Sequence, residues 1–444
     1  MSLITLSLAG LLTLVTASEP ASSPGSKVHA QDALVLVEGH SPAGGVALGC
    51  GVVTGDGSWV VCPHCIVQET SSVGRHSLAR VIRVISPYLG QTALPRVEYS
   101  DTEQGLALVQ VPWKGHPALA LADPNRVIEA NEVMLVSMPF LLGDIPKEVV
   151  SVPESNGLFS ECRLPVDYVT LRKGVPQWVV ALGQGHLQPG STGPLLSTAG
   201  SQVLALTWEL GSNYEWLQGR CVHTLRSHLH EQTPGPSDAT PAGLQRASDG
   251  LDVLRRRALW SLQANAHQYE AALDTARTLQ LLRPQQVEGY LLGAEAADGL
   301  RRFDQAETLY KQAIERSAEP IVKIRCMRFL QRQGRLKEAR AILDTLWGEQ
   351  DLRPFLSGDV YRVLKGQPDL CLDYLNQSIQ VNPNCAHTWL AIGQCRSHMG
   401  QHGAAAEAAS KAVELYPEDE DTRYALLDLL HRAGRFEKME QQHH

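Results

Sequence analysis

Positive charge and long apolar runs are both scarce in this sequence of 444 residues. Lys and Arg number 39 against 47 Asp and Glu, which gives a formal net charge of -8. Proteins that bind DNA or RNA need a basic face for the phosphates, so the charge argues against a nucleic acid as partner. The one apolar run near the N-terminus, residues 3–15, is shorter than the roughly 20 residues that span a bilayer. We therefore expect no stable membrane span.

The same apolar run has the length and character of the core of a secretory signal. Val15 and Ala17 are small residues of the kind that precede a cleavage point, here at Ser18. The usual positive start of a signal is missing, because the first basic residue is Lys27. We expect residues 1–17 to be a signal peptide and the chain to be exported, periplasmic or secreted. A cytoplasmic chain and an uncleaved anchor are the alternatives.

Cysteine is too scarce for a disulfide-rich scaffold, since the chain has 9, an odd number. Cys62-Pro63-His64-Cys65 matches the active-site motif of periplasmic thiol oxidases of the DsbA type, in which proline and histidine favour the thiolate. A strand-like run precedes the motif, but the polar segment after it does not read as a helix. We expect Cys62 and Cys65 to be structural or to form a local disulfide. A thiol–disulfide oxidoreductase site is an alternative, and the other cysteines are expected to be small buried residues.

The first half of the chain consists of short β-rich runs separated by Gly, Pro and Asn or Asp turns. The main runs lie at residues 33–37, 46–53, 58–61, 81–85, 106–111, 133–137, 178–182 and 203–208. Such a pattern predicts an all-β barrel or sandwich.

Three stretches of this half carry more specific patterns. Residues 49–61 read GCGVVTGDGSWVV, residues 101–109 read DTEQGLALV, and residues 186–196 read HLQPGSTGPLL. In their order and separation they resemble the histidine, aspartate and nucleophile segments of trypsin-like serine proteases, especially the HtrA/Deg type. The resemblance covers residues 45–208 and implies a trypsin-like double β-barrel in a domain at residues 30–230.

The resemblance also implies positions for a catalytic triad of hydroxyl, imidazole and carboxylate. The candidates that carry suitable side chains are His64, Asp101 and Ser191, whereas alignment without gaps gives Cys65, Gly105 and Thr192. The nucleophile loop is one residue short. An unoriented imidazole costs about 10⁴ in rate, and a lost oxyanion donor about 10²–10³. We therefore expect an inactive barrel, with an active serine endopeptidase as the alternative.

Other histidines in this half lie in or beside predicted loops. His40, His76, His116 and His186 are expected to be solvated rather than to act as ligands. No second ligand pair accompanies the cysteines at the spacing of a zinc site. We expect neither a metal nor another cofactor.

The second half changes to helix-forming residues after a linker. Residues 231–243 contain three prolines and two glycines but no large apolar residue, and we expect a linker at residues 231–248. The tetratricopeptide repeat has a period of about 34 residues. Gly366 and Gly400 are separated by this interval, as are Pro383 and Pro417. The pattern predicts an all-α tetratricopeptide solenoid at residues 249–440, with five repeats and a partial C-terminal cap.

Tetratricopeptide arrays bind protein or peptide partners in a groove lined by the first helix of each repeat. The family register places these side chains in the groove: Arg257, Glu288, Leu291, Glu295, Arg328, Leu356, His387, Leu390, Gln394 and His398. The resulting hypothesis is an exported adaptor with an inactive protease-like barrel and a partner-binding array. Two alternatives are an active endopeptidase that recruits substrates through the repeats, and repeats that only stabilise the barrel or form a dimer.

Overall fold

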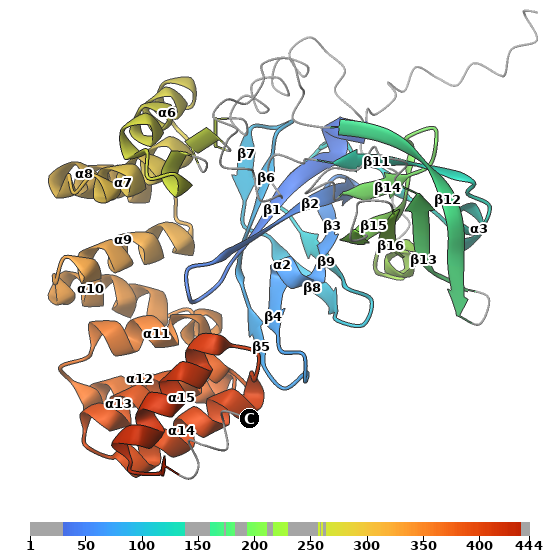
Figure 1. Ribbon diagram of the computed structural model, residues 1–444. Helices are drawn as coiled ribbons and strands as arrows, with labels where there is room; N and C mark the ends of the chain where they lie inside the picture. The colour runs from blue at the N-terminus through green and yellow to red at the C-terminus, as the bar shows by residue number, and fades with distance from the viewer. Residues whose placement is uncertain are drawn as a thin grey trace, which may run out of the picture.

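The computed structural model describes residues 30–137, 160–172, 175–182, 193–210, 216–229, 256–257, 259–260 and 263–436. Strands fill the first part and helices the last, and the helices form a curved column beside the β domain (Figure 1). This order confirms the predicted all-β part followed by an all-α part. In these ranges, no helix has the length and apolar character of a membrane span. Residues 1–17 and 231–248 lie outside them, so the signal peptide and the linker stay predictions.

The first sheet of the β domain has seven strands in the order β7-β6-β1-β2-β3-β9-β8. Strand β1 is buried along its whole length because both of its faces are apolar: Leu34 and Leu36 pack in one cluster, and Val35 and Val37 in another. The strands are β1 Leu34–His40, β2 Val46–Thr54, β3 Trp59–Pro63, β6 Val81–Ser86, β7 Gln91–Ala93, β8 Arg96–Asp101 and β9 Leu106–Gln110. The short helix α2, His64–Val67, follows β3 and leads to a hairpin of β4, Gln68–Thr70, and β5, Ser77–Ala79.

The second sheet closes on itself. Its order is β10-β15-β14-β11-β12-β13-β16, and an additional pairing of β15 with β16 completes a ring of strands. The strands are β10 Ala120–Leu121, β11 Glu132–Ser137, β12 Ser160–Arg172, β13 Val175–Leu182, β14 Pro194–Leu196, β15 Gln202–Leu210 and β16 Trp216–Cys221. Leu196 and Val203 of this sheet share a buried cluster with Leu36 and Val61 of the first, so the two sheets form one domain.

The helical part is a series of paired helices. They are α6 Tyr269–Leu282, α7 Glu288–Gly299, α8 Phe303–Arg316, α9 Pro320–Arg332, α10 Leu336–Trp347, α11 Arg353–Val363, α12 Pro368–Val381, α13 Ala386–His398, α14 His402–Leu415 and α15 Glu420–Arg432. Small residues allow the partners of a pair to approach: a Cβ on Gly393 of α13 would lie 2.9 Å from the backbone oxygen of Ala405 in α14. Gly400 turns the chain between them at a φ of +73°.

The helices contact the β domain through the outer strands of the first sheet. Val81 of β6 belongs to the buried apolar cluster of the helices. The β4–β5 hairpin and β6 lie beside the column of helices in Figure 1. The two halves therefore pack against each other.

Three predictions about buried residues need correction. His40, His76 and His116, expected in solvent, are all buried, because each lies between packed elements rather than on a loop surface. Cys371 of α12 and Cys395 of α13 form a disulfide, whereas they were predicted to be separate apolar residues. Cys62 and Cys65 are both free, so of the two alternatives stated for them the local disulfide is wrong and a structural role remains.

Candidate functional site

The histidine implied by the protease resemblance, His64, lies at the end of β3, where α2 begins. Its backbone N–H donates to the carbonyl oxygen of Gly105 at 2.9 Å, which attaches the histidine to the β8–β9 turn. The imidazole is buried, with Nδ1 2.6 Å from the Ser100 hydroxyl and Nε2 3.2 Å from that of Thr70. Burial lowers the pKa of His64, and the nearby charge of Asp101 only partly opposes this. The imidazole is therefore neutral at pH 7.

The carboxylate Asp101 makes turn contacts rather than contacts with the imidazole. It accepts hydrogen bonds from the Tyr99 hydroxyl at 2.8 Å and from the backbone N–H groups of Glu103 and Gln104 at 2.8 and 3.0 Å. Burial alone would raise the pKa of Asp101, but these hydrogen bonds, that of Gln104 first, hold it below its usual range. Gly105, the gapless aspartate position, adopts a φ of +67° in the same turn and has no side chain to offer.

Sequence reasoning missed Ser100 and Thr70, the two hydroxyls that contact the imidazole of His64. Ser100 lies on β8 opposite Ala107 of β9, one position along from the pair of Asp101 and Leu106. The register of this strand pair decides which of two neighbouring residues faces the imidazole, and a motif search has no access to that register. Thr70 ends the strand that follows α2.

The nucleophile candidates Ser191 and Thr192, together with His186, lie outside the described residues. The description resumes at Gly193, the residue after the two candidates. Its N–H donates to the Thr207 hydroxyl at 2.6 Å, and its carbonyl oxygen accepts from the Thr207 N–H at 3.0 Å. The end of the predicted nucleophile loop is thus held to β15.

The two cysteines of the Cys-Pro-His-Cys motif are unsuited to redox chemistry. Cys62 is fully buried in β3, and burial raises its pKa far above the usual range. Cys65 is exposed to solvent, and desolvation by neighbouring groups still raises the pKa of its thiol, although the charge of Arg80 opposes this. A redox cysteine needs a stabilised thiolate at the start of a helix, and α2 has only four residues. The oxidoreductase alternative therefore has no support.

The predicted peptide groove is in part occupied by the β domain of the same chain. Arg83 of β6, whose side chain is 1% exposed, donates from Nη2 to Glu288 of α7 at 2.7 Å and from Nε to Glu319 at 2.5 Å. Its Nη1 lies 3.2 Å from Glu38 of β1, which also pairs with Arg257. Two of the predicted groove residues, Arg257 and Glu288, thus contact the first sheet instead of a partner.

Further groove positions have internal partners too. Arg328 donates to the carbonyl oxygen of Pro42 at 2.8 Å and to Asp359. His387 lies 2.9 Å from Glu69 of β4. Leu291 and Leu356 are buried in the helical core, and Glu295 pairs with Arg325. The last three positions, Leu390, Gln394 and His398 of α13, are half-buried or exposed, and His398 contacts the Tyr361 hydroxyl within the helical part.

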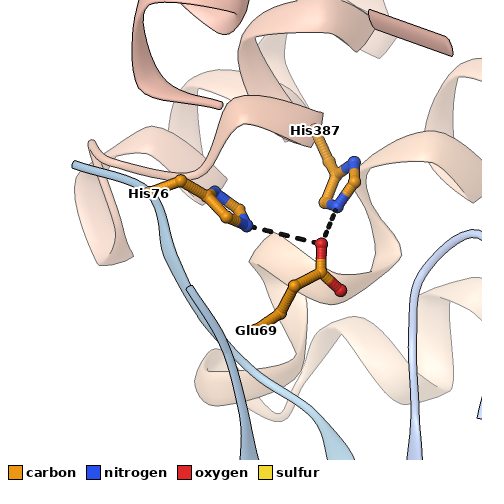
Figure 2. Close-up of side chains that lie close together, drawn as sticks. All are labelled: Glu69, His76 and His387. Atoms are coloured by element: carbon orange, nitrogen blue, oxygen red, sulfur yellow. Dashed lines mark hydrogen bonds and ion pairs between the residues drawn. The ribbon is translucent and has the colours of Figure 1, made fainter. Parts of the chain in front are cut away.

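A cluster that the sequence did not predict lies where the β4–β5 hairpin meets α13. Figure 2 shows Glu69, His76 and His387 with their polar atoms converging. One ligand atom from each lies within 4.8 Å of the other two. No local pattern in the sequence indicates this cluster, because His387 is 318 residues from Glu69.

Comparison with known proteins identifies the repeats directly. A tetratricopeptide-repeat family model matches residues 386–419, which cover α13 and α14. A search of curated proteins found no match. The two-sheet β domain and the helical array confirm the predicted order of an all-β domain followed by an all-α region, and this match shows a tetratricopeptide repeat at α13 and α14.

Two solved structures resemble the chain. The active form of the Rv3671c protease from M. tuberculosis is 16% identical, over 49% of this chain and 95% of that one, with a TM-score of 0.33. The HtrA-type protease AlgW, solved with a tripeptide, is 14% identical over 47% of this chain and 62% of that one, also with a TM-score of 0.33.

Proposed function

We propose that the chain is an exported protein-interaction adaptor whose trypsin-like β domain does not hydrolyse peptide bonds. The main support is the contact of His64 Nδ1 with the Ser100 hydroxyl at 2.6 Å, at the atom where a working triad has a carboxylate. That carboxylate stabilises the imidazolium that forms when histidine takes the proton of the nucleophile. A hydroxyl carries no charge, and loss of the carboxylate costs about 10⁴ in rate.

The other side of the imidazole also argues against catalysis. Nε2 has to accept the proton of the nucleophile, and it lies 3.2 Å from the Thr70 hydroxyl. A hydroxyl at this distance competes with an attacking serine for the same atom.

Labelling with a fluorophosphonate, which reacts with activated serines, tests the loss of activity. The wild-type chain and Ser191→Ala should show the same background signal, while an active trypsin-like protease labels in parallel. Labelling of the wild type that disappears in Ser191→Ala would contradict the proposal.

The adaptor role depends on the repeats. Because the β domain covers the positions near Arg257, Glu288 and Arg328, we propose that a partner peptide or protein contacts the free end of the array at Gln394 and His398 of α13. Gln394→Arg with His398→Glu should reduce the set of proteins that the tagged chain captures. Lys411→Glu on α14, also exposed and paired only with Glu414 among the described residues, is the matched control. Equal capture by the two variants would place the partner elsewhere.

Export has one structural support. The disulfide of Cys371 and Cys395 is typical of proteins in oxidising compartments. Cell fractionation with N-terminal sequencing of the mature chain tests this: we expect exported protein beginning at Ser18. Full-length protein confined to the cytoplasm would contradict it.

An active serine endopeptidase that recruits substrates through its repeats is the second candidate. It is favoured by the retention of a neutral imidazole at His64, beside the end of the β8–β9 turn. The fluorophosphonate experiment separates the two candidates.

A further inference from the structure

We propose that Glu69, His76 and His387 form a zinc site that joins the β4–β5 hairpin of the β domain to α13 of the repeats. Two imidazoles and one carboxylate are a common ligand set for Zn²⁺ with a fourth position for water. The three residues come from different elements and meet only because the two halves of the chain pack together (Figure 2).

The distances suit a zinc ion with small adjustments. Zinc bonds to nitrogen and oxygen ligands are about 2.0–2.2 Å long, so ligand atoms in a tetrahedral site lie about 3.3 Å apart. Nε2 of His76 lies 3.5 Å and Nε2 of His387 lies 2.9 Å from the same oxygen, Oε1 of Glu69. All three ligand atoms lie within 4.8 Å of one another, so a shift of the side chains would bring them to the separations of a tetrahedral site.

The second, independent observation is that Nε2 of His76 makes no hydrogen bond of normal geometry in the described part of the chain, and its printed contact is the long one of 3.5 Å to Oε1 of Glu69. The His76 side chain is 0% exposed, so no solvent satisfies this atom. A buried polar atom without a partner is costly, and this one is directed at Glu69. A metal ion bound at Nε2 would remove that cost.

The other nitrogen of His76, Nδ1, has a backbone donor and a backbone acceptor beside it. Nδ1 lies 3.3 Å from the carbonyl oxygen of Asn384 and 3.1 Å from the backbone N–H of Ala386. With zinc at Nε2, Nδ1 carries the proton and donates it to Asn384, as metal-bound histidines commonly donate to a carbonyl. Without zinc, the other tautomer accepts from Ala386. Tyr416 stacks on the imidazole at 4.7 Å and fixes the plane of the ring.

The charges around the cluster leave Oε1 of Glu69 available for a cation. The Arg80 guanidinium lies 3.7 Å from the other carboxylate oxygen, Oε2. Burial alone would raise the pKa of Glu69, but His387, His76 and Arg80 hold it well below its usual range, so the carboxylate is ionised. His387 is 16% exposed, which leaves a route for water to the fourth position.

Zinc titration of the full chain, stripped with a chelator and followed by calorimetry at pH 7.5, tests the site. We expect one tight zinc per chain and at least about 100-fold weaker binding in His387→Gln and in Glu69→Gln, with each variant first shown to be folded by circular dichroism. His431→Gln, on α15 and outside the cluster, is the matched control for zinc held by exposed histidines. It should bind as the wild type does.

Two further readouts make the result independent of one variant. Cobalt(II) should give the strong visible absorption of a tetrahedral site in the wild type but not in Glu69→Gln, and zinc should raise the melting temperature of the wild type by a few degrees. Equal zinc affinity in the wild type, His387→Gln and Glu69→Gln, or no saturable binding at all, would overturn the proposal.

Discussion

Nη2 of Arg83 in the β domain donates to Oε1 of Glu288 in the repeats at 2.7 Å, across 205 residues of sequence. Both side chains are almost fully buried. Because Glu38 and Glu319 surround the same guanidinium, one cation neutralises carboxylates from both halves of the chain. The repeats are therefore attached to the first sheet by a specific buried network.

Removal of the cation from this network should be strongly destabilising. Arg83→Met leaves Glu288 buried without its main partner and removes one of the two arginines beside Glu38, where Arg257 remains. Breaking such a buried network typically costs about 3–5 kcal/mol. Urea unfolding should show this loss. Arg96→Met on β8 is the matched control, because that side chain is 80% exposed and pairs with Glu98 on the surface, and it should change the free energy of unfolding by less than about 1 kcal/mol. Equal stability of the two variants would show that the network contributes little.

Stability should fall in acid through His116. Burial lowers its pKa from 6.5 to about 4, and its two nitrogens lie 2.7 Å from the Ser86 hydroxyl and 2.8 Å from the Pro117 carbonyl oxygen. Because the pKa of His116 is lower in the folded chain, the unfolded chain binds the proton at a higher pH than the folded chain does. The contribution of neutral His116 to the free energy of unfolding is thus complete above pH 6.5. It falls by about 3 kcal/mol as the pH is lowered towards 4.

The pH dependence of urea unfolding checks this expectation. His116→Gln should flatten the slope between pH 6.5 and 4, while His398→Gln on the exposed side of α13 keeps it. Part of the slope remains in His116→Gln, because burial also lowers the pKa of His40 to about 4. The same slope in the wild type and His116→Gln would mean that His116 does not titrate in this way.

The contact of Ser100 with His64 allows the missing carboxylate to be restored. Ser100→Asp places a negative charge against Nδ1 of His64, and an opposite charge at that distance favours the protonated imidazole. The pKa of His64, measured by NMR titration, should rise from its lowered value towards or above 6.5. Ser100→Ala, with no charge, should not raise it in this way. An unchanged pKa in Ser100→Asp would mean that residue 100 does not face the imidazole.

The disulfide of Cys371 and Cys395 determines how many cysteines can be alkylated before reduction, and mass spectrometry can count them. Alkylation of the unfolded chain without reduction should modify every cysteine except these two. When the chain is reduced first, these two should be modified as well. Closing a loop of this sequence separation contributes about 3 kcal/mol, so Cys371→Ser should lower stability by that order. Modification of all cysteines before reduction would contradict the pairing.

The sequence predicted the two classes of fold well, because strands and helical repeats follow local patterns. Apolar, β-branched runs became β1 to β3, and the 34-residue period became paired helices. The contacts between the halves could not be predicted in this way. Arg83 interrupts an apolar run, which is a sign that it has a buried partner, but the partner Glu319 is 236 residues away.

The candidate site was predicted only in part for the same reason. Gapless alignment gave Cys65 and Gly105, and His64 followed only with a one-residue gap, so the assignment of the histidine stays a prediction. The roles of Ser100 and Thr70 depend on strand register, and the cluster of Glu69, His76 and His387 depends on the packing of two domains. The family register also assumed an open groove, whereas the β domain of the same chain fills part of it.

Peptide-bond hydrolysis by the purified mature chain tests the central claim most directly. Initial rates on casein and on a mixed peptide library should be the same for the wild type and Ser191→Ala, with both at the level of the buffer. Turnover by the wild type that is lost in Ser191→Ala would contradict the account.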